Sequence, residues 1–592
     1  MIIQIVLLGF IALVTAARFE PDLPTIKLPW GVWQAKVYEE DDQIYIFRNV
    51  RFGALPERFG RPSFPGEKSD AIQNIEQDIS CIQLNTKGIE DPPGGNNPVG
   101  SPGNDAVLET EDCLFLDIYV PVSAFEPDTD LLPVVVWING GAYAFGSKNP
   151  SGPIASGRSI LNTSKYQTIY IQGNYRLGAF GWLAGDYMQK VGQPNAGLYD
   201  QALLLEWVQE YVNLVKGDKT RVSAWGESAG AGSVLHHLIR EDGTKDPLFK
   251  TFAIQSPAFQ WAWDNSPGGT LDAVYKNYSD FAGCGHEFNI DCLRSASVEK
   301  LRSANQKIFS SFNLTRLFPV GPAVDGNWVK ALPAVSFSQG KFWNDIDSAI
   351  ISHCADESFG FTPTVRNESQ FDQFLESFLP GPHLEPQINA IKKQYNCTKL
   401  YNGNFQSCLA DIVRDASFTC NTRDLFESYP LVSYMMEYSF PFEFIAFHAS
   451  DLYPLFTNSA EELFTILNST MNSTIGEMLA LMYTEALYLP GIPQVYKNYF
   501  ASFAITGNPN EGLQPPDKWW VVADGSDDLL TNVMYVSADL LFGKSFRNGT
   551  DHQNSKSSCS FWAELANELS RGPGKNGGMT IQYQPLRGTS EL

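Results

Sequence analysis

The sequence is poor in positive charge, which limits the partners that the protein can have. Its 592 residues include 42 Lys and Arg against 66 Asp and Glu, giving a formal net charge of −24 at pH 7. Nucleic acid and anionic membrane surfaces repel so acidic a chain, so neither is expected as a partner. Hydrophobic residues make up 43% of the chain and no repeat period is present, which indicates a globular protein with a large core.

Long apolar runs are also lacking, apart from one at the start of the chain. Residues 2–14 are almost wholly apolar and are followed by Thr15, Ala16, Ala17 and the first charge, Arg18. This run is shorter than the roughly 20 residues of a membrane span and ends in small residues. We therefore predict a signal peptide, residues 1–17, rather than an N-terminal anchor. Residues 571–592 are polar and are expected to form a flexible tail without an anchor signal.

Cysteine and histidine are scarce, with nine and seven residues. Nine cysteines allow four disulfides and one free thiol in an oxidising compartment. No two histidines have the spacing of metal ligands, so no metal and no cofactor is predicted. Asn-x-Ser/Thr sequons, which are glycosylation candidates, agree with a secreted, extracellular protein. They lie at Asn162, Asn277, Asn313, Asn367, Asn396, Asn468, Asn472 and Asn548.

Short apolar runs rich in β-branched residues alternate with helical patterns along the chain. Residues 133–138, 168–171 and 221–225 are predicted strands. Residues 196–215 have helical spacing, which is expected to stop at Gly217. Strand and helix in alternation predict a doubly wound α/β sheet.

The segment RVSAWGESAGAGS, residues 221–233, holds Ser228 between Gly226 and Gly230 where a strand pattern gives way to a helical one. Glycines at these positions allow a sharp reversal that leaves the serine exposed at the start of a helix. The segment is a candidate nucleophile elbow. By itself the pattern also fits an ordinary glycine-rich loop. The assignment therefore depends on whether the chain also supplies a base, an acid and oxyanion donors.

A serine nucleophile needs a histidine base, which follows the acid in the chain order of α/β-hydrolases. His448 lies in a loop after a strand-like run, where catalytic groups are common. The other six histidines fit less well. His236 and His237 lie on the helix leaving the elbow, and His353 lies inside a strand pattern. His286, His383 and His552 lie in polar or Pro-rich segments.

Two neighbouring carboxylates, Asp356 and Glu357, follow the strand-like residues 349–352. Either could accept a hydrogen bond from the imidazole Nδ1–H, and local chemistry does not choose between them. Oxyanion donors are expected from the glycine turn after residues 133–138 and from the residue after the nucleophile. The candidate N–H groups are those of Gly141, Ala142 and Ala229.

Several short motifs follow one another along the chain. They are EDCLFLDIYVP (111–121), WINGGAYAFGS (137–147), NYRLGAFGWL (174–183), NAGLYDQ (195–201), AWGESAG (224–230), AIQSPAF (253–259), ADE (355–357) and FHASDL (447–452). In this order they resemble the type-B carboxylesterase/lipase family, which includes the cholinesterases, and look closest to its secreted fungal members. The resemblance implies one α/β-hydrolase domain over residues 18–570, with a mostly parallel central sheet. Residues 265–345 and 365–500, which are rich in helix signals, would form a helical cap.

The resemblance also assigns roles to the candidate site residues. It implies that Ser228 is the nucleophile, Glu357 rather than Asp356 the acid, and His448 the base. Gly141, Ala142 and Ala229 match the oxyanion positions. The implied activity is carboxylic-ester hydrolysis of a small-molecule ester without a cofactor.

Disulfides and ion pairs are implied in the same way. Cys81 would pair with Cys113, Cys284 with Cys292 and Cys420 with Cys559, each as in the family. Proximity leaves Cys397 with Cys408, and Cys354 as a free, buried thiol. Structural ion pairs would join Arg176 to Asp200 and Arg58 to Glu111.

Some positions depart from the family pattern. Ala142, Ser358 and Ala449 stand where glycines are usual, but none of these changes removes a chemical group. The loop between residues 81 and 113 is where lipases of the family carry an amphipathic lid, and its residues 87–106 are rich in Pro, Gly and Asn and poor in large apolar residues. We therefore expect an esterase for small or soluble esters. The alternatives are an interfacial lipase of the same family and a non-catalytic cholinesterase-like binding protein.

Overall fold

The computed structural model describes residues 23–73, 75–85, 107–149, 154–260, 265–312, 315–471, 473–513, 515, 517–525, 528–538 and 545–570. Several predicted features lie outside these residues. They are the signal peptide (1–17), the tail (571–592), the lid segment (87–106) and the sequons at Asn313 and Asn472.

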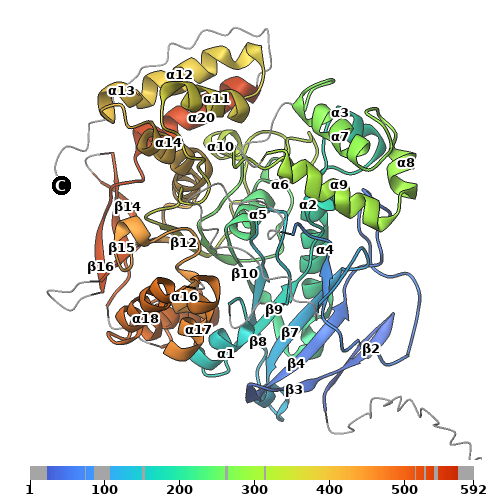
Figure 1. Cartoon of the computed structure of the whole chain (residues 1–592). Coiled ribbons are helices and arrows are strands. Elements are labelled where there is room, and N and C mark those ends of the chain that lie inside the picture. Colours follow the sequence, from blue (N-terminus) through green and yellow to red (C-terminus); the bar gives the residue numbers. More distant parts are fainter. Residues whose placement is uncertain are drawn as a thin grey trace, which may run out of the picture.

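A twelve-stranded sheet runs through the described part of the chain (Figure 1). Its inner strands are parallel, in the order β15 (Leu530–Val536), β13 (Ser433–Tyr438), β12 (Ser348–Cys354), β11 (Thr251–Gln255), β10 (Gly217–Glu227), β8 (Leu132–Ile138) and β9 (Ile169–Gly173). Antiparallel strands flank them: β14 (Ala523–Asp524) and β16 (Phe546–Asp551) beside β15, and β7 (Phe115–Pro121), β4 (Asp41–Arg51) and β3 (Lys36–Tyr38) beyond β9. Two small sheets pair β1 (Thr25–Leu28) with β2 (Gly31–Gln34) and β5 (Ile79–Cys81) with β6 (Leu108–Thr110). The predicted α/β sheet is therefore confirmed.

The helix predicted over residues 196–215 is α4 (Ala196–Tyr211), continued by a 3₁₀ turn, Val212–Val215. Its end differs from the prediction. Lys216, not Gly217, takes the left-handed conformation, with φ of 66°, and Gly217 already begins β10. Gly217 is needed for packing, because a Cβ there would lie 2.4 Å from the Val212 side chain.

Alternating side chains of the central strands divide the core between the two faces of the sheet. Val134, Val136 and Ile138 of β8 belong to an apolar cluster that includes α4 and α5 (Ala229–Leu238). Val135 and Trp137 face the opposite way, into a cluster with α1 (Gly157–Thr163), α16 (Leu452–Phe456) and α19 (Ile492–Thr506). Because helices cover both faces, β8 is buried on both sides, as its continuous apolar run predicts.

Most of the remaining helices form three groups around the sheet (Figure 1). One contains α3 (Asp186–Val191), α7 (Thr270–Phe281), α8 (Ile290–Ser295) and α9 (Val298–Ser310). The second contains α10 (Pro333–Ser338), α11 (Glu368–Phe378), α12 (Glu385–Tyr395), α13 (Cys397–Leu400), α14 (Phe405–Arg414), α15 (Cys420–Ser428) and α20 (Lys556–Ser570). The third contains α16, α17 (Ala460–Met471) and α18 (Thr474–Tyr488), while α2 (Gly178–Trp182) and α6 (Arg240–Gly243) are short connecting helices. The range 365–500 is not wholly helical, since it supplies β13 to the sheet.

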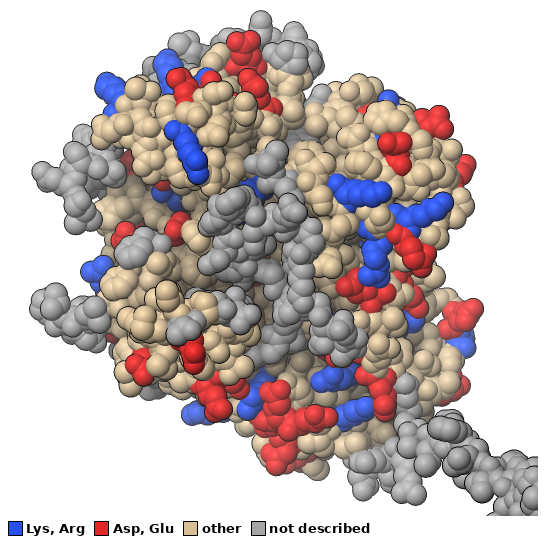
Figure 2. Space-filling model, viewed as in Figure 1, with Lys and Arg blue, Asp and Glu red and all other residues tan. Residues whose placement is uncertain are grey.

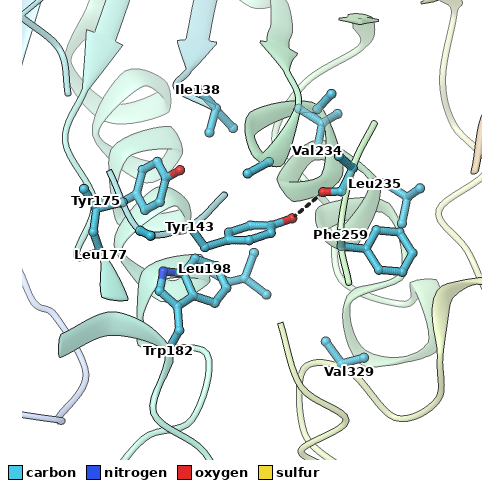
Figure 3. Packing of buried hydrophobic residues seen from close by; sticks show 14 of the residues in the cluster. Ile138, Tyr143, Tyr175, Leu177, Trp182, Leu198, Val234, Leu235, Phe259 and Val329 are labelled. Carbon is cyan, nitrogen blue, oxygen red and sulfur yellow. Dashed lines mark hydrogen bonds between the residues drawn. The ribbon is translucent and has the colours of Figure 1, made fainter. Parts of the chain in front are cut away.

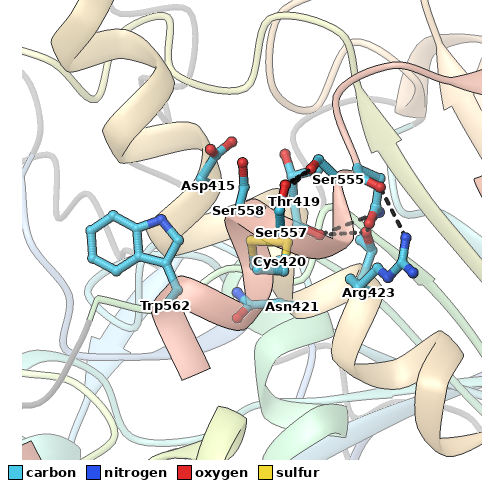
Figure 4. The surroundings of a disulfide bond; sticks show 12 residues. Asp415, Thr419, Cys420, Asn421, Arg423, Ser555, Ser557, Ser558 and Trp562 are labelled. Atoms are coloured by element: carbon cyan, nitrogen blue, oxygen red, sulfur yellow. Dashed lines mark hydrogen bonds between the residues drawn. A yellow bond between two sulfur atoms is a disulfide. The ribbon is translucent and has the colours of Figure 1, made fainter. Parts of the chain in front are cut away.

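Four disulfides join segments of the described chain. The described cysteines pair as Cys81–Cys113, Cys284–Cys292, Cys397–Cys408 and Cys420–Cys559, and Cys354 is free and buried. The last bridge ties α15 to α20 beside Trp562 (Figure 4) and closes a separation of 139 residues. Closing so long a loop stabilises a fold by about 5 kcal/mol in the chain-entropy view.

Ion pairs hold the loops near the sheet. Arg176 meets Asp200 at 2.8 Å and both are buried, while Arg58 meets Glu111 at 2.7 Å. A third pair, between the buried Lys148 and Asp117 at 2.9 Å, had no signal in the sequence analysis. On the face drawn in Figure 2, Lys and Arg are interspersed with Asp and Glu and form no single basic patch.

Candidate active site

Ser228 lies at a strained turn between β10 and α5. Its φ of 57° and ψ of −126° place a non-glycine residue in a conformation that L-residues rarely adopt. Backbone bonds hold the turn: the Ser228 N–H donates to the Gln255 carbonyl at 3.0 Å, and the Ser228 carbonyl accepts from Gly232 and Ala258. The turn has the form of a nucleophile elbow.

The flanking glycines are required by close packing at this turn. A Cβ on Gly230 would lie 2.0 Å from the Ile138 carbonyl oxygen, and one on Gly226 would lie 2.7 Å from the Gly230 backbone. Side chains at either position would push α5 away from β8 and β10. The glycines thus set the distance between the start of the helix and the end of the central strands.

Glu357 and His448 lie together, although 91 residues separate them in the chain. His448 Nδ1 is 2.6 Å from Glu357 Oε2, and the other carboxylate oxygen accepts the Cys354 N–H at 2.7 Å. Burial raises the pKa of Glu357, but the charge and hydrogen bond of His448 outweigh this and leave that pKa lowered. Glu357 is therefore ionised and accepts the Nδ1–H, so in the neutral ring Nε2 is the basic nitrogen.

The neighbouring Asp356 does not contact His448. Its backbone N–H donates to the Ala446 carbonyl, and the residue forms a β-bridge with Phe447. Burial raises the pKa of Asp356 to about 6. Of the two carboxylates that local chemistry left open, the structure brings only Glu357 to the imidazole.

Nε2 of His448 faces a residue that the sequence analysis did not select. It lies 3.1 Å from Glu227 Oε1, but the geometry is not that of a hydrogen bond and both atoms are buried without a partner. No hydrogen bond among the described residues joins Nε2 to Ser228. Burial raises the pKa of Glu227 to about 8. Burial lowers the pKa of His448, but Glu227 and Glu357 together raise it to about 9.

The turn after β8 supplies free backbone donors next to the serine. Gly141, Ala142 and Tyr143 all have positive φ, of 103°, 52° and 59°. None of the hydrogen bonds of the described residues uses the N–H of Gly141, Ala142 or Ala229. Ala142 and Ala229 line the same cavity as Ser228. Unpaired N–H groups at such a place can hold a developing oxyanion.

Tyr143 anchors this turn in the core. Figure 3 shows its ring above Trp182 and beside Tyr175, and the Tyr143–Trp182 ring centroids are 4.6 Å apart. Its hydroxyl donates to the Ala258 carbonyl at 3.1 Å. Because Ala258 N–H in turn donates to the Ser228 carbonyl, the oxyanion turn and the elbow share one rigid support.

The cavity at Ser228 has a volume of about 70 Å³ and is lined mostly by apolar side chains. Its lining includes Phe361 and Phe418, whose rings meet the His448 ring edge-to-face at 5.0 Å each. Phe418 belongs to a π-helical turn, Asp415–Thr419, and such turns are frequent at functional sites. The sequence analysis missed both phenylalanines, which carry no motif.

The other histidines are accounted for elsewhere. His236 Nδ1 contacts the Gly232 carbonyl, His237 Nε2 contacts Gln201 and His353 Nε2 contacts Asp551. The remaining three, His286, His383 and His552, are exposed.

Comparisons with known proteins show the family and the fold of the chain. The chain matches the carboxylesterase family over residues 22–562. A secreted lipase of Arthroderma benhamiae is 33% identical over 588 residues, which cover 96% of this chain and 99% of that protein. Carboxylesterase patB of Aspergillus clavatus is 29% identical and is matched over 86% of this chain and 92% of its own. The crystal structure of Aspergillus niger EstA shares the fold, with a TM-score of 0.71 and 23% identity over 93% of this chain and 99% of that one.

The fold and the family match define a carboxylic-ester hydrolase with the α/β-hydrolase fold. The chain belongs to the carboxylesterase family. Among the residues that the structure describes, no helix combines the length and apolarity needed to cross a membrane.

Proposed function

We propose that this protein is a secreted serine esterase in which Ser228, His448 and Glu357 hydrolyse small or soluble esters through an acyl-enzyme. The observation that carries the proposal is the 2.6 Å contact between His448 Nδ1 and Glu357, which leaves Nε2 as a base beside the Ser228 elbow. Residues 18–570 would form one domain in which the helical segments cap the sheet.

In the acylation step, His448 Nε2 takes the Ser228 proton while Oγ attacks the ester carbonyl. The oxygen becomes negative and is held by the N–H groups of Gly141, Ala142 and Ala229. Glu357 stabilises the imidazolium that forms. His448 then gives the proton to the departing alcohol, and the acyl group stays on Ser228.

In the deacylation step, water takes the place of the alcohol. His448 accepts a proton from the water, which attacks the acyl carbonyl and again forms an oxyanion at the same N–H groups. Collapse releases the acid and returns the proton to Ser228. Apart from the ester and water, both steps use side chains and backbone N–H groups of this chain.

Replacement of two serines in one cavity tests the proposal. Ser228→Ala should lower kcat for 4-nitrophenyl butanoate by about 10⁵-fold or more, since the nucleophile is lost. Ser417→Ala, which alters another serine of the lining, should stay within a few-fold of the parent. Equal turnover by the parent and Ser228→Ala would remove Ser228 from the mechanism.

An interfacial lipase is the second candidate, and α18 favours it. Ile475, Met478, Leu479 and Met482 of this helix are 69%, 56%, 49% and 59% exposed. Such a face could rest on an ester surface. Assays above and below the solubility limit of a glyceride separate the two candidates: an esterase shows no rise in rate at the limit, whereas a lipase shows a sharp one.

We further propose that the protein is exported and glycosylated. The sequons at Asn162, Asn277, Asn367, Asn396 and Asn548 are exposed, and Asn468 is half-buried. A fungal host should therefore release the protein into the medium with N-glycans. Treatment with an N-glycosidase should reduce its mass, and an unchanged mass would count against this proposal.

A further inference from the structure

One charged side chain stands out in the apolar cavity at Ser228. Arg316 is the only charged residue among the described residues of its lining. Most of the lining consists of phenylalanine and small apolar residues. A cation in such surroundings is placed where an anionic group would be bound strongly, because few waters compete for it.

The backbone around Arg316 is fixed by hydrogen bonds. Arg316 has a left-handed φ of 59°, and its N–H donates to the Phe312 carbonyl at 3.1 Å. Two residues later, Phe318 N–H donates to Gln260 Oε1 at 2.7 Å and Gln260 Nε2 donates to the Phe318 carbonyl at 3.2 Å. The Gln260 amide is thereby occupied, so it holds the segment in place and leaves Arg316 as the charged donor of the cavity.

The guanidinium of Arg316 has no protein partner among the described residues. Its Nε is buried without a hydrogen bond, and no described carboxylate lies within ion-pair distance. Other buried or half-buried arginines are paired: Arg58 with Glu111, Arg176 with Asp200 and Arg414 with Asp415. An unpaired buried donor is destabilising unless a ligand satisfies it.

We propose that Arg316 binds a carboxylate carried by the ester substrate, so that the enzyme prefers esters with a second, ionised acid group. This inference rests on the proposed function, since it concerns the substrate of Ser228. The planar guanidinium suits a bidentate carboxylate. The described lining carries one positive charge and no second cation. Its charge therefore balances a monoanion better than a phosphate dianion. The phenylalanines would pack on the hydrocarbon between the two groups.

The experiment compares matched acidic and neutral esters. 4-Nitrophenyl hemiglutarate against 4-nitrophenyl pentanoate tests a carboxylate in the acyl half, and 4-carboxyphenyl pentanoate against 4-methylphenyl pentanoate tests one in the alcohol half. For at least one pair, Arg316→Met should lower the acidic-to-neutral ratio of kcat/KM about 10- to 100-fold relative to the parent. Arg316→Lys should retain part of the preference.

The neutral ester measures folding in the same preparation, and Arg366→Met, at an exposed arginine outside the cavity lining, is the matched control. That control should leave both ratios unchanged. If Arg316→Met hydrolyses the neutral esters but shifts neither ratio by more than twofold, the inference is wrong and the proposed function is untouched. If the parent protein hydrolyses none of the four esters, the proposed function itself fails.

Discussion

Two buried histidines in the described part of the chain each lie beside two carboxylates, but only His448 contacts Glu227, the residue that precedes Ser228. His448 contacts Glu357 at 2.6 Å and Glu227 at 3.1 Å, next to the Ser228 elbow. His353, on β12, contacts Asp551 at 2.8 Å, and the Glu437 carboxylate completes a group whose ligand atoms lie within 4.8 Å of one another. The two clusters have similar residues and similar burial.

Their ring nitrogens differ. At His353, Nε2 meets Asp551 and Nδ1 meets the Cys354 carbonyl at 3.1 Å, so both nitrogens are used. Burial lowers the pKa of His353, but Asp551 raises it to about 10, so the charged ring is favoured beside that carboxylate. At His448, Nε2 has no hydrogen-bond partner. A buried histidine between carboxylates can act as a base only where one nitrogen is left free beside a nucleophile.

The largest difference should appear when each histidine is replaced by glutamine. His448→Gln should lower kcat for 4-nitrophenyl butanoate by about 10⁵-fold, because the base is lost. His353→Gln should keep kcat within about threefold per folded molecule. Circular dichroism in the near and far ultraviolet checks that each preparation is folded. Similar losses in both variants would mean that the two clusters do not differ in function.

Replacing the carboxylates beside His448 should give the next effect. Glu357→Gln should lower kcat by about 10⁴-fold, because the amide no longer fixes the Nδ1–H tautomer or stabilises the imidazolium. The matched variant Asp356→Asn should lose less than tenfold, since Asp356 does not contact the imidazole. Steady-state kinetics on both variants provide the comparison, and the reverse order would make Asp356 the acid.

The cluster of His353, Asp551 and Glu437 should affect the stability of the fold. His353→Gln leaves the buried Asp551 without its cation and should cost about 3 kcal/mol of the free energy of unfolding. The exposed neighbour His552 supplies a control, because His552→Gln should change this quantity by less than about 0.5 kcal/mol. Denaturant unfolding with the disulfides intact measures both, and equal midpoints would show that the His353–Asp551 pair contributes nothing.

The smallest effect should be a shift in pH dependence. The Glu227 carboxylate raises the pKa of His448, so Glu227→Gln should lower that pKa. His448 acts as a base only when unprotonated, and the acid limb of kcat/KM should therefore move to lower pH, by about one unit. In the parent protein, the midpoint of this acid limb should lie above pH 6.5, the ordinary pKa of histidine. An unmoved limb in Glu227→Gln would rule out the electrostatic coupling.

Much of the fold follows from local pattern. The strands at 133–138 and 221–225 and the helix at 196–211 carry enough apolar periodicity to be found without the structure. Strand β4 does not, because its DDQIYIFRNVR sequence mixes charged and apolar residues and is defined by pairing with β7 and β3. The prediction that the helix stops at Gly217 fails for a similar reason, because this glycine is required by close packing against Val212, which the local sequence pattern does not show.

The site was predictable only where a motif marks it. The prediction of Ser228 and His448 follows from spacing and chain order, whereas the choice between Asp356 and Glu357 depends on the turn that follows β12. The backbone bridge from Asp356 to Phe447 fixes which of the two reaches the imidazole. Glu227 stands at a position that the Gly-x-Ser-x-Gly pattern does not specify, and its contact with His448 exists only in the folded chain.

The most direct test is the site of reaction with a fluorophosphonate, which bonds covalently to an activated serine. We expect one adduct per molecule, located by peptide mass spectrometry on Ser228, with labelling much slower in His448→Gln and unchanged in His353→Gln. No adduct, or an adduct on another serine such as Ser417, would contradict the assignment of Ser228 and His448 as nucleophile and base.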